Sequence, residues 1–238
     1  MMPPADPERY KNHRFPGEII SHGVWLSYRF PLSYRDVEEM LLARGIEVTH
    51  EAIRQWCLKF GQDYANQRKH RCAQPGDKWH LAEVFLTING QRHSLWRAVD
   101  QDDNGLAILG QSRRNKPAAT QFLRKLLKGL RYVPRVIITD KLKSYGAAKR
   151  ESLPGVEHRQ SRSLNNRCEH AQRPTRQCAY RMPGCKSPGQ AQRCLSAYGP
   201  IAPHFRPRHH LWSAAAYRAE RTNRFASGVE ITGTERAA

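Results

Sequence analysis

The spacing of apolar residues divides the chain into a helical part followed by a part rich in strands. Between residues 33 and 60, apolar side chains recur every three to four positions, which is the period of an amphipathic helix. Within residues 79–89 the pattern changes, and Val84, Leu86 and Ile88 occupy every second position, as the inward residues of a strand do. The two periods predict two regions of different structural class.

The first region predicts two helices joined by a turn. Ser33 can cap the first helix, and Gly45 suits the left-handed conformation in which helices commonly end. Thr49 can cap a second helix, which Gly61 is expected to end. A helix, a short turn with glycine and a second capped helix describe a helix-turn-helix, predicted here over residues 32–61.

The exposed face of the second helix offers side chains suited to DNA. In a helix-turn-helix, the amino-terminal part of the second helix enters the major groove, where Arg and Gln make two-point contacts with guanine and adenine. The candidate DNA-binding residues are Thr49, His50, Glu51, Arg54 and Gln55. An ordinary αα-hairpin packed on its neighbour explains the spacing equally well, and only the basic charge of the chain favours DNA.

Strand patterns and turn signals predict a sheet in the second region, residues 78–205. Asn89-Gly90 is a strong hairpin signal, and it joins the first strand to a second one over residues 95–99. A third strand follows over residues 106–109. The region is therefore expected to begin with three antiparallel strands.

A helix and a fourth strand complete the predicted α/β order. Pro117 opens the helix and Gly129 is its expected end. Val136–Ile138 is a buried strand that finishes at Asp140, and a parallel fourth strand would bring Asp140 close to the first strand. The predicted fold class is thus α/β, a mixed sheet with flanking helices, preceded by a small helical domain.

Three segments lack such patterns. Residues 1–31 are Pro-rich and polar, with a short packed element expected near their end. Residues 62–77 are polar and basic and predict a linker. Residues 206–238 form a basic tail with little hydrophobic pattern, and this tail is expected to be partly disordered.

The charge balance narrows the class of partner. Lysine and arginine total 40 and aspartate and glutamate 21, which gives a net charge of +19 at pH 7. Such an excess favours a polyanionic partner, and nucleic acid is the commonest. No membrane is expected as a partner, because no run approaches the roughly 18 apolar residues of a spanning helix. The amino terminus lacks a signal-peptide pattern, so the expected location is the cytosol.

Two acidic residues are candidates for metal-dependent chemistry on phosphates. Phosphoryl transfer by two metals needs clustered carboxylates, and Mg²⁺ prefers oxygen ligands. Asp140 ends a buried strand, although a turn or a helix cap explains such an aspartate equally well. Glu169 is the only acidic residue between Glu157 and Glu220, and it suits either a charge partner for nearby arginines or a metal ligand.

Longer stretches of the sequence resemble the transposases of the insertion-sequence-six family. The matching runs include WHLAEVFLTINGQRHSLWRAVDQD, PRVIITDKLKSYGAAKRE and VEHRQSRSLNNRCEH, and the helix-turn-helix segment LSYRDVEEMLLARGIEVTHEAIRQW matches as well. The resemblance implies an RNase H-like core with an Asp, Asp, Glu triad that holds two Mg²⁺ ions. It also implies a homo-oligomer, associated with the bacterial nucleoid, that cuts DNA at terminal inverted repeats and joins the ends to target DNA.

Two of the three triad positions of the family are present. Asp140 matches the second carboxylate, in the TDK motif, and Glu169 matches the third, in the NN-x-x-E motif. The first belongs to the motif W-H-[MLV]-D-E, where this chain reads WHLAE and holds Ala82 in place of the aspartate. DNA contacts are further expected from the basic residues around these carboxylates, namely Lys141, Lys143, Arg162 and Arg167.

Ala82 changes the chemistry that is expected. The first aspartate of the triad bridges both metals, so its loss is expected to cost several orders of magnitude in rate. Glu83 should face the opposite side of the strand, and Asp100, at the end of the second strand, is a weaker candidate for partial rescue. Three alternatives stay open: an active transposase with a substitute ligand, a repressor-like DNA-binding protein without catalysis, and a relic that folds poorly.

Overall fold

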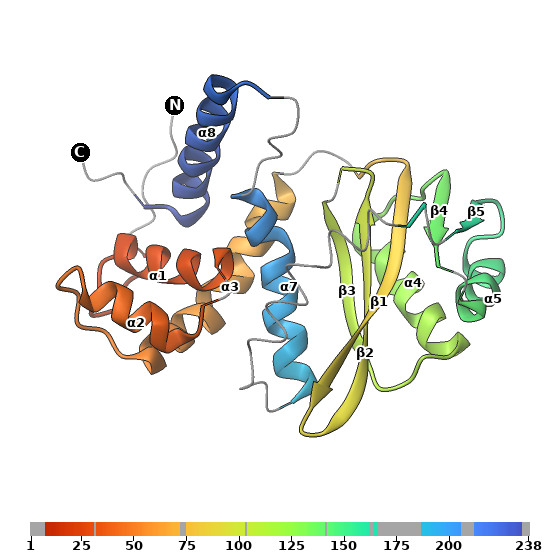
Figure 1. Cartoon of the computed structure of the whole chain (residues 1–238), viewed down its shortest axis with the longest axis horizontal. Helices are drawn as coiled ribbons and strands as arrows, with labels where there is room; N and C mark the ends of the chain where they lie inside the picture. Colours follow the sequence, from red (N-terminus) through yellow and green to blue (C-terminus); the bar gives the residue numbers. More distant parts are fainter. Residues whose placement is uncertain are drawn as a thin grey trace. The chain divides into compact units, whose positions relative to one another are not determined.

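The chain folds as two compact units (Figure 1). One unit comprises Met1–Cys72 and Pro200–Ala238, and the other comprises Ala73–Gly199. The chain passes between them inside helix α7 (Pro188–His204), at Pro200, which has no N–H to donate to the helix. The computed structural model describes residues 8–30, 32–71, 75–102, 104–140, 142–161, 164–165, 187–205 and 212–234.

The first unit is helical. Its helices are α1 (Gly17–Arg29), α2 (Tyr34–Leu42), α3 (His50–His70), the last turn of α7, and α8 (Ala214–Thr232). Their apolar faces meet in a core in which Ile20, Val24, Val37 and Ile53 have no exposed surface. Burial of these side chains, at about 1.5–3 kcal/mol each, is the main stabilising term of the unit.

The α2–turn–α3 segment has the local features that the sequence predicts. Ser33 and Asp36 form a capping box at the start of α2, and the Thr49 hydroxyl accepts the N–H of Ala52 at 3.3 Å at the start of α3. Gly45 has a φ of +73°, the left-handed conformation predicted for it. The helix, the glycine turn and the second capped helix are therefore all present.

Helix α3 is longer than the sequence predicts, so the predicted end at Gly61 is wrong, and the linker predicted over residues 62–77 is helical as far as His70. The helix continues to His70 because its later turns are packed against the rest of the unit: Tyr64 is buried, and its hydroxyl lies 2.6 Å from that of Tyr10. Gly61 faces the ring of Tyr28, where a Cβ atom would lie only 2.5 Å from the Tyr28 hydroxyl oxygen. Gly61 thus serves close packing inside the helix.

Helices α1 and α8 also exceed the predictions for the two ends of the chain. The short packed element expected before residue 31 is the thirteen-residue helix α1. Residues 214–232, part of the tail expected to be partly disordered, form α8, which begins at a Ser213 cap and ends at Gly233 with a φ of +67°. Tertiary contacts explain this helix, because Phe225 packs against Trp25 and Phe205, at ring-centroid distances of 5.5 and 5.2 Å.

The second unit is built on a five-stranded mixed sheet with the order β3-β2-β1-β4-β5. Its strands are β1 (Lys78–Ile88), β2 (Gln91–Asp100), β3 (Gly105–Gln111), β4 (Val136–Thr139) and β5 (Glu157–Gln160). The first three are antiparallel, and β4 and β5 continue the sheet in parallel from β1. The α/β class and the mixed sheet with flanking helices are confirmed.

Local turn chemistry sets the register of the sheet. The hairpin between β1 and β2 turns at Asn89 and Gly90, whose φ values of +49° and +75° belong to the tight turn predicted from this pair.

On the outer edge, the Gln192 side chain accepts the N–H of Gly110 and donates to the carbonyl of Ile108. This side chain of α7 therefore satisfies backbone groups that an edge strand would otherwise leave open.

Helices α4 (Lys116–Leu130) and α5 (Lys143–Ser152) lie on one side of the sheet (Figure 1). They cover a core that includes Trp79, Leu81, Trp96, Phe122 and Tyr145. The sequence did not predict α5 or β5, which are short and have weak hydrophobic patterns.

The predicted end of α4 at Gly129 is wrong. Gly129 is exposed and lies inside the helix, and the residue that turns the chain is Arg131, which has a φ of +51°. Arg131 bonds its N–H to the carbonyl of Leu127 at 2.9 Å, as a helix-ending residue does. The residue in the left-handed conformation is thus Arg131, two positions after the glycine that the sequence favours.

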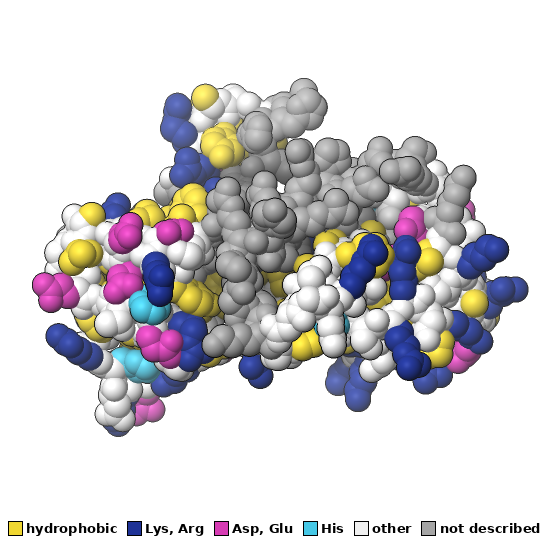
Figure 2. Space-filling model, turned by 60° about the horizontal axis from the view of Figure 1, so that its bottom comes forward, with side chains coloured by type: hydrophobic (Ala, Val, Ile, Leu, Met, Phe, Trp, Pro, Cys, Tyr) yellow, Lys and Arg dark blue, Asp and Glu magenta, His cyan; other side chains and the backbone are white. Residues whose placement is uncertain are grey.

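Basic side chains are distributed over both units. In the face turned to the viewer in Figure 2, lysine and arginine side chains occur across the described surface of each unit and are not confined to one segment. Across the described residues, no helix is both long and apolar enough to cross a membrane.

Candidate active site

Asp140 leaves the sheet beside Ala82. Strands β1 and β4 run parallel, and their paired residues end with Leu81 opposite Thr139. The next residues along the two strands are Ala82 and Asp140, so the WHLAE and TDK motifs are neighbours across the sheet. The expectation that a parallel fourth strand brings Asp140 to the first strand is confirmed.

Ala82 offers only a methyl group at this position. The residue is 6% exposed and packs against Val99, whereas Leu81 lies in the core under α4 and α5. Arg97, which is buried, is the residue opposite Ala82 on β2. An aspartate at position 82 would therefore place a carboxylate between a buried arginine and Asp140.

The backbone around Asp140 is fixed by hydrogen bonds. Asp140 Oδ1 accepts the N–H of Leu142 at 3.0 Å, and the Thr139 hydroxyl donates to the Asp140 carbonyl at 2.8 Å. The Thr139 hydroxyl also lies 2.9 Å from Nε2 of His158, on β5, whose pKa is lowered by burial and by Lys149. These contacts hold the Asp140 carboxylate at the end of β4, where its side chain stays 37% exposed.

Glu83, the residue after Ala82, is held by Arg114. Its side chain is 1% exposed, and Oε2 accepts from Arg114 Nε at 3.0 Å and from Arg114 Nη2 at 2.7 Å. The same Nη2 lies 3.7 Å from Asp140 Oδ2. Burial, followed by the negative charge of Asp140, raises the pKa of Glu83, and Arg114 opposes both effects. Arg114 is therefore the cation shared by the two carboxylates.

Asp100 is committed to a turn. Its Oδ1 accepts the N–H of Asp102 at 2.8 Å and that of Asn104 at 2.9 Å, and its Oδ2 accepts from the Asn104 side chain at 3.0 Å. It stands opposite Trp79 in the sheet, whereas Arg97 stands opposite Ala82. Both oxygens of Asp100 therefore shape the connection between β2 and β3, which counts against its candidacy as a substitute for the missing carboxylate.

The start of the NN-x-x-E motif is anchored to β1. Asn165 is 2% exposed, and its side-chain N–H donates to the carbonyl of Leu81 at 2.9 Å. This bond places Asn165 beside the residue that precedes Ala82. Asn165 belongs to the NN-x-x-E motif, but local sequence contains no signal for this contact, which joins residues 84 positions apart. The catalytic candidate Glu169 and the DNA-binding candidates Lys141, Arg162 and Arg167 lie outside the described residues.

The predicted DNA-binding residues lie near the start of α3. Arg54 donates to both oxygens of Glu51, at 2.8 and 2.6 Å, and Gln55 donates to Glu51 Oε1 at 2.9 Å. The hydrogen bonds from Arg54, the larger contribution, and from Gln55 lower the pKa of Glu51 to about 2. His50 Nδ1 lies 3.0 Å from a Glu38 oxygen on α2, and Thr49 is the helix cap. Lys143, the remaining candidate in the described chain, begins α5.

Of the described residues, only part of a two-metal site is present. Asp140 is the one described triad carboxylate, and no group of three or more His, Cys, Asp or Glu side chains in this part of the chain is placed to hold a metal. Glu83 directs its Oε2 to Arg114, and Ala82 has no oxygen in its side chain. The described residues therefore do not fit a pair of Mg²⁺ ions.

Comparison with known proteins gives the family. The model of a DDE domain matches residues 76–207. The transposase for insertion sequence element IS257 in transposon Tn4003 of Staphylococcus aureus is 31% identical over 176 residues, which cover 69% of this chain and 75% of that protein. The transposase for the insertion sequence-like element IS431mec of Staphylococcus aureus strain Mu50 has the same identity and coverage.

Two solved structures are similar at low identity. The HTLV-2 integrase catalytic core domain in complex with magnesium is 10% identical, covers 61% of this chain and 95% of its own, and has a TM-score of 0.40. The catalytic core domain of BIV integrase is 12% identical, covers 64% and 98% of the two chains, and has a TM-score of 0.36. On the family match and the sequence identity, the chain belongs to the insertion-sequence-six family of DDE transposases.

Proposed function

We propose that this chain is the transposase of a bacterial insertion sequence and that Ala82 strongly reduces its catalytic activity. In this proposal, it binds the terminal inverted repeats of the element, acts on them as a homo-oligomer, and cuts and joins DNA strands at Asp140 and Glu169. The observation that carries the proposal is the position of Ala82 beside Asp140 on adjacent parallel strands, in a chain of this family.

The helical unit supplies the proposed recognition of the repeats. Helix α3 begins at a capped turn, and its first turns present Arg54 and Gln55, two residue types that read guanine and adenine edges in the major groove. Both side chains donate hydrogen bonds to Glu51 on the exposed surface of the helix. The charge of +19 supports a polyanionic partner.

Mg²⁺ is the cofactor that the proposed reaction calls for, and it would supply Lewis-acid chemistry at the phosphate. The missing carboxylate at position 82 is the proposed cause of low activity, because a two-metal site needs clustered carboxylates. Glu169, four positions after Asn165 in the NN-x-x-E motif, is the residue proposed to supply the third carboxylate.

A second function is favoured by the contacts of Glu83. Its carboxylate is bound to Arg114 and buried, so the nearest acidic residue in the sequence is a poor substitute for the missing aspartate. With no substitute, the chain would bind terminal repeats without cutting them and would interfere with an active relative, as a repressor-like protein does. The two functions predict different results in one assay.

The deciding experiment is strand transfer on DNA that carries the ends of the element, with Mg²⁺ or Mn²⁺. The native chain is compared with Ala82→Asp. The matched control is Ala82→Asn, because an asparagine side chain has nearly the same size as aspartate but carries no carboxylate. We expect Ala82→Asp to raise the rate about a thousandfold or more, on the scale of losses from a cooperating catalytic set, and Ala82→Asn to have no effect.

The native chain itself separates the two functions. A slow reaction that Asp140→Asn abolishes supports an impaired enzyme, and no reaction together with specific binding supports the repressor-like protein. If Ala82→Asp folds and binds the repeats but transfers no strands, the proposed enzyme is wrong.

Repeat recognition is tested separately by gel shift. Arg54→Gln is expected to reduce the preference for the terminal repeat over a random duplex by about tenfold, the loss of one base contact. Arg71→Gln, which removes the same charge just beyond the carboxyl end of α3, should leave that preference unchanged. Equal effects of the two variants would contradict recognition by the first turns of α3.

A further inference from the structure

An exposed aromatic ring on β1 is flanked by two arginines. Phe85 is 43% exposed, which is unusual for a phenylalanine in a strand. The guanidinium carbon of Arg92, on β2, lies 3.6 Å from the centre of the Phe85 ring, and that of Arg114 lies 5.4 Å from it. Such cation–π contacts order the two guanidinium groups at the surface. We call these three residues the Phe85 strip: Arg92, Phe85 and Arg114.

The buried Glu83 carboxylate holds the Arg114 side chain in place. The carboxylate of Glu83 is almost fully buried, and a buried charge is tolerated only when it is paired. Glu83 accepts from Nε and Nη2 of Arg114, which leaves Nη1 without a hydrogen bond to any described residue. Since a guanidinium has five N–H donors in a rigid plane, the remaining donors point in a defined direction.

The Phe85 strip reaches the candidate active site. Arg114 Nη2 is 3.7 Å from Asp140 Oδ2, so one end of the strip touches the carboxylate at which DNA cutting is proposed. A phosphate that approaches Asp140 meets a like charge, and a cation between the two reduces this repulsion. Arg114 occupies such a position, and Arg92 extends the positive surface along β2.

We propose that the Phe85 strip binds the DNA backbone and leads it to Asp140, with Glu83 as the residue that positions Arg114. The ligand is a phosphodiester group, because the planar guanidinium fork matches phosphate oxygens in two-point contacts. Arg92 lies over the Phe85 ring, so the ring orders the arginine and is not free to stack on a base. The proposal rests on the proposed function in taking DNA as the ligand and Asp140 as the cutting site.

The test measures how DNA affinity depends on salt. The native chain, Arg92→Gln and Arg114→Gln are titrated with a random-sequence duplex at several salt concentrations between about 50 and 200 mM. Each lost phosphate contact should make the slope of log K against log salt shallower by about 0.9. The affinity ratio of native chain to variant should then fall about threefold across this range.

The matched control is Arg135→Gln. Arg135 directly precedes β4, at the end of the strand opposite Asp140, where it pairs with Asp77 at 3.7 Å. The variant removes the same charge from the same unit, so it corrects for the general effect of net charge. Its slope should equal that of the native chain.

Glu83→Gln distinguishes positioning from simple charge. It removes a negative charge, so general electrostatics predicts tighter DNA binding. Positioning predicts the opposite, weaker binding with a shallower slope, because Arg114 loses its anchor. In the double variant with Arg114→Gln, the loss should be smaller than the sum of the two single losses.

The outcomes are decisive in each direction. Shallower slopes in Arg92→Gln and Arg114→Gln but not in Arg135→Gln support the strip, and equal slopes in all three overturn it. Tighter binding by Glu83→Gln overturns the positioning role. Arg92 has no buried acidic partner among the described residues, so Arg92→Gln tests the strip even if loss of Arg114 prevents folding. The random duplex and the native Ala82 chain keep this result independent of strand transfer and of repeat recognition.

Discussion

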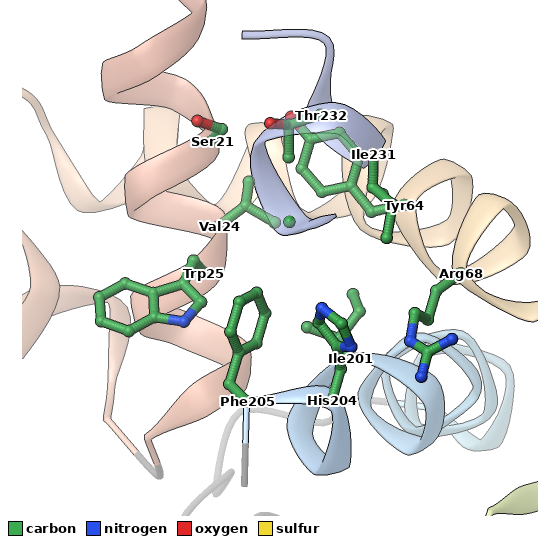
Figure 3. Close-up of a pocket in the computed structure, with 11 residues that line it drawn as sticks. Ser21, Val24, Trp25, Tyr64, Arg68, Ile201, His204, Phe205, Ile231 and Thr232 are labelled. Atoms are coloured by element: carbon green, nitrogen blue, oxygen red, sulfur yellow. The ribbon is translucent and has the colours of Figure 1, made fainter. Parts of the chain in front are cut away.

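His204 is expected to make the stability of the helical unit depend on pH. It is the last residue of α7, is 7% exposed, and lines a pocket together with Trp25, Tyr64 and Arg68 (Figure 3). Its Nε2 donates to the carbonyl of Arg224 at 2.9 Å, and its Nδ1 has no partner among the described residues. Burial, followed by the charge of Arg68, lowers the pKa of His204 from 6.5 to about 4.

The sign and size of the effect follow from these two pKa values. Between pH 6.5 and pH 4 the unfolded chain binds a proton at His204 and the folded chain does not, so stability falls as the pH falls. At about 1.4 kcal/mol per pKa unit, the full loss is about 3 kcal/mol. Between pH 7 and pH 5 the loss is about 2 kcal/mol, because the native group stays neutral there.

The assay compares urea unfolding of the native chain and His204→Gln at pH 7, 6 and 5. Glutamine keeps an N–H that can donate to the Arg224 carbonyl but does not titrate. We expect the variant to be close to the native chain at pH 5 or more stable, and to lose about 2 kcal/mol less between pH 7 and pH 5. If both chains lose the same stability over this range, His204 does not carry the effect.

The remaining predictions concern packing and the anchor of the third motif. Gly61→Ala should destabilise the chain by about 1–3 kcal/mol because its Cβ would meet the Tyr28 ring, whereas Gly129→Ala, on an open helix face, should stabilise it by up to about 1 kcal/mol; thermal unfolding measures both. Asn165→Ala should cost about 1–2 kcal/mol by leaving the Leu81 carbonyl unpaired. In an Ala82→Asp background it should also slow strand transfer, and an unchanged rate would contradict the anchoring role.

The sequence by itself determined the features that have local causes. The caps at Ser33 and Thr49, the left-handed Gly45 and the Asn89-Gly90 hairpin are where the pattern predicts them, because each depends on residues a few positions apart. The buried strand that ends at Asp140 has the same kind of cause, since four consecutive buried positions specify it. The resemblance of whole motifs supplied the family, which the comparisons confirm.

The position of Asp140 beside Ala82 combines both kinds of information. The sequence predicts a strand that ends at Asp140. If this strand is parallel to the first, Asp140 is expected to lie close to the first strand. Only the sheet shows that the pairing ends with Leu81 opposite Thr139, which makes the next two residues neighbours. The chemical importance of Ala82 was therefore visible in the sequence, whereas its geometry was not.

Only the tertiary structure decided the features that depend on distant residues. Helix α3 continues past Gly61, and Tyr28 packs on that glycine. Helix α8 forms because Phe225 packs on Trp25. Neither α8 nor the part of α3 after Gly61 has a strong helical pattern in the sequence. The link from Glu83 through Arg114 to Asp140 joins residues on three separate segments. Local spacing carries no information about such contacts, since burial and pairing over long sequence distances arise only when the chain has folded.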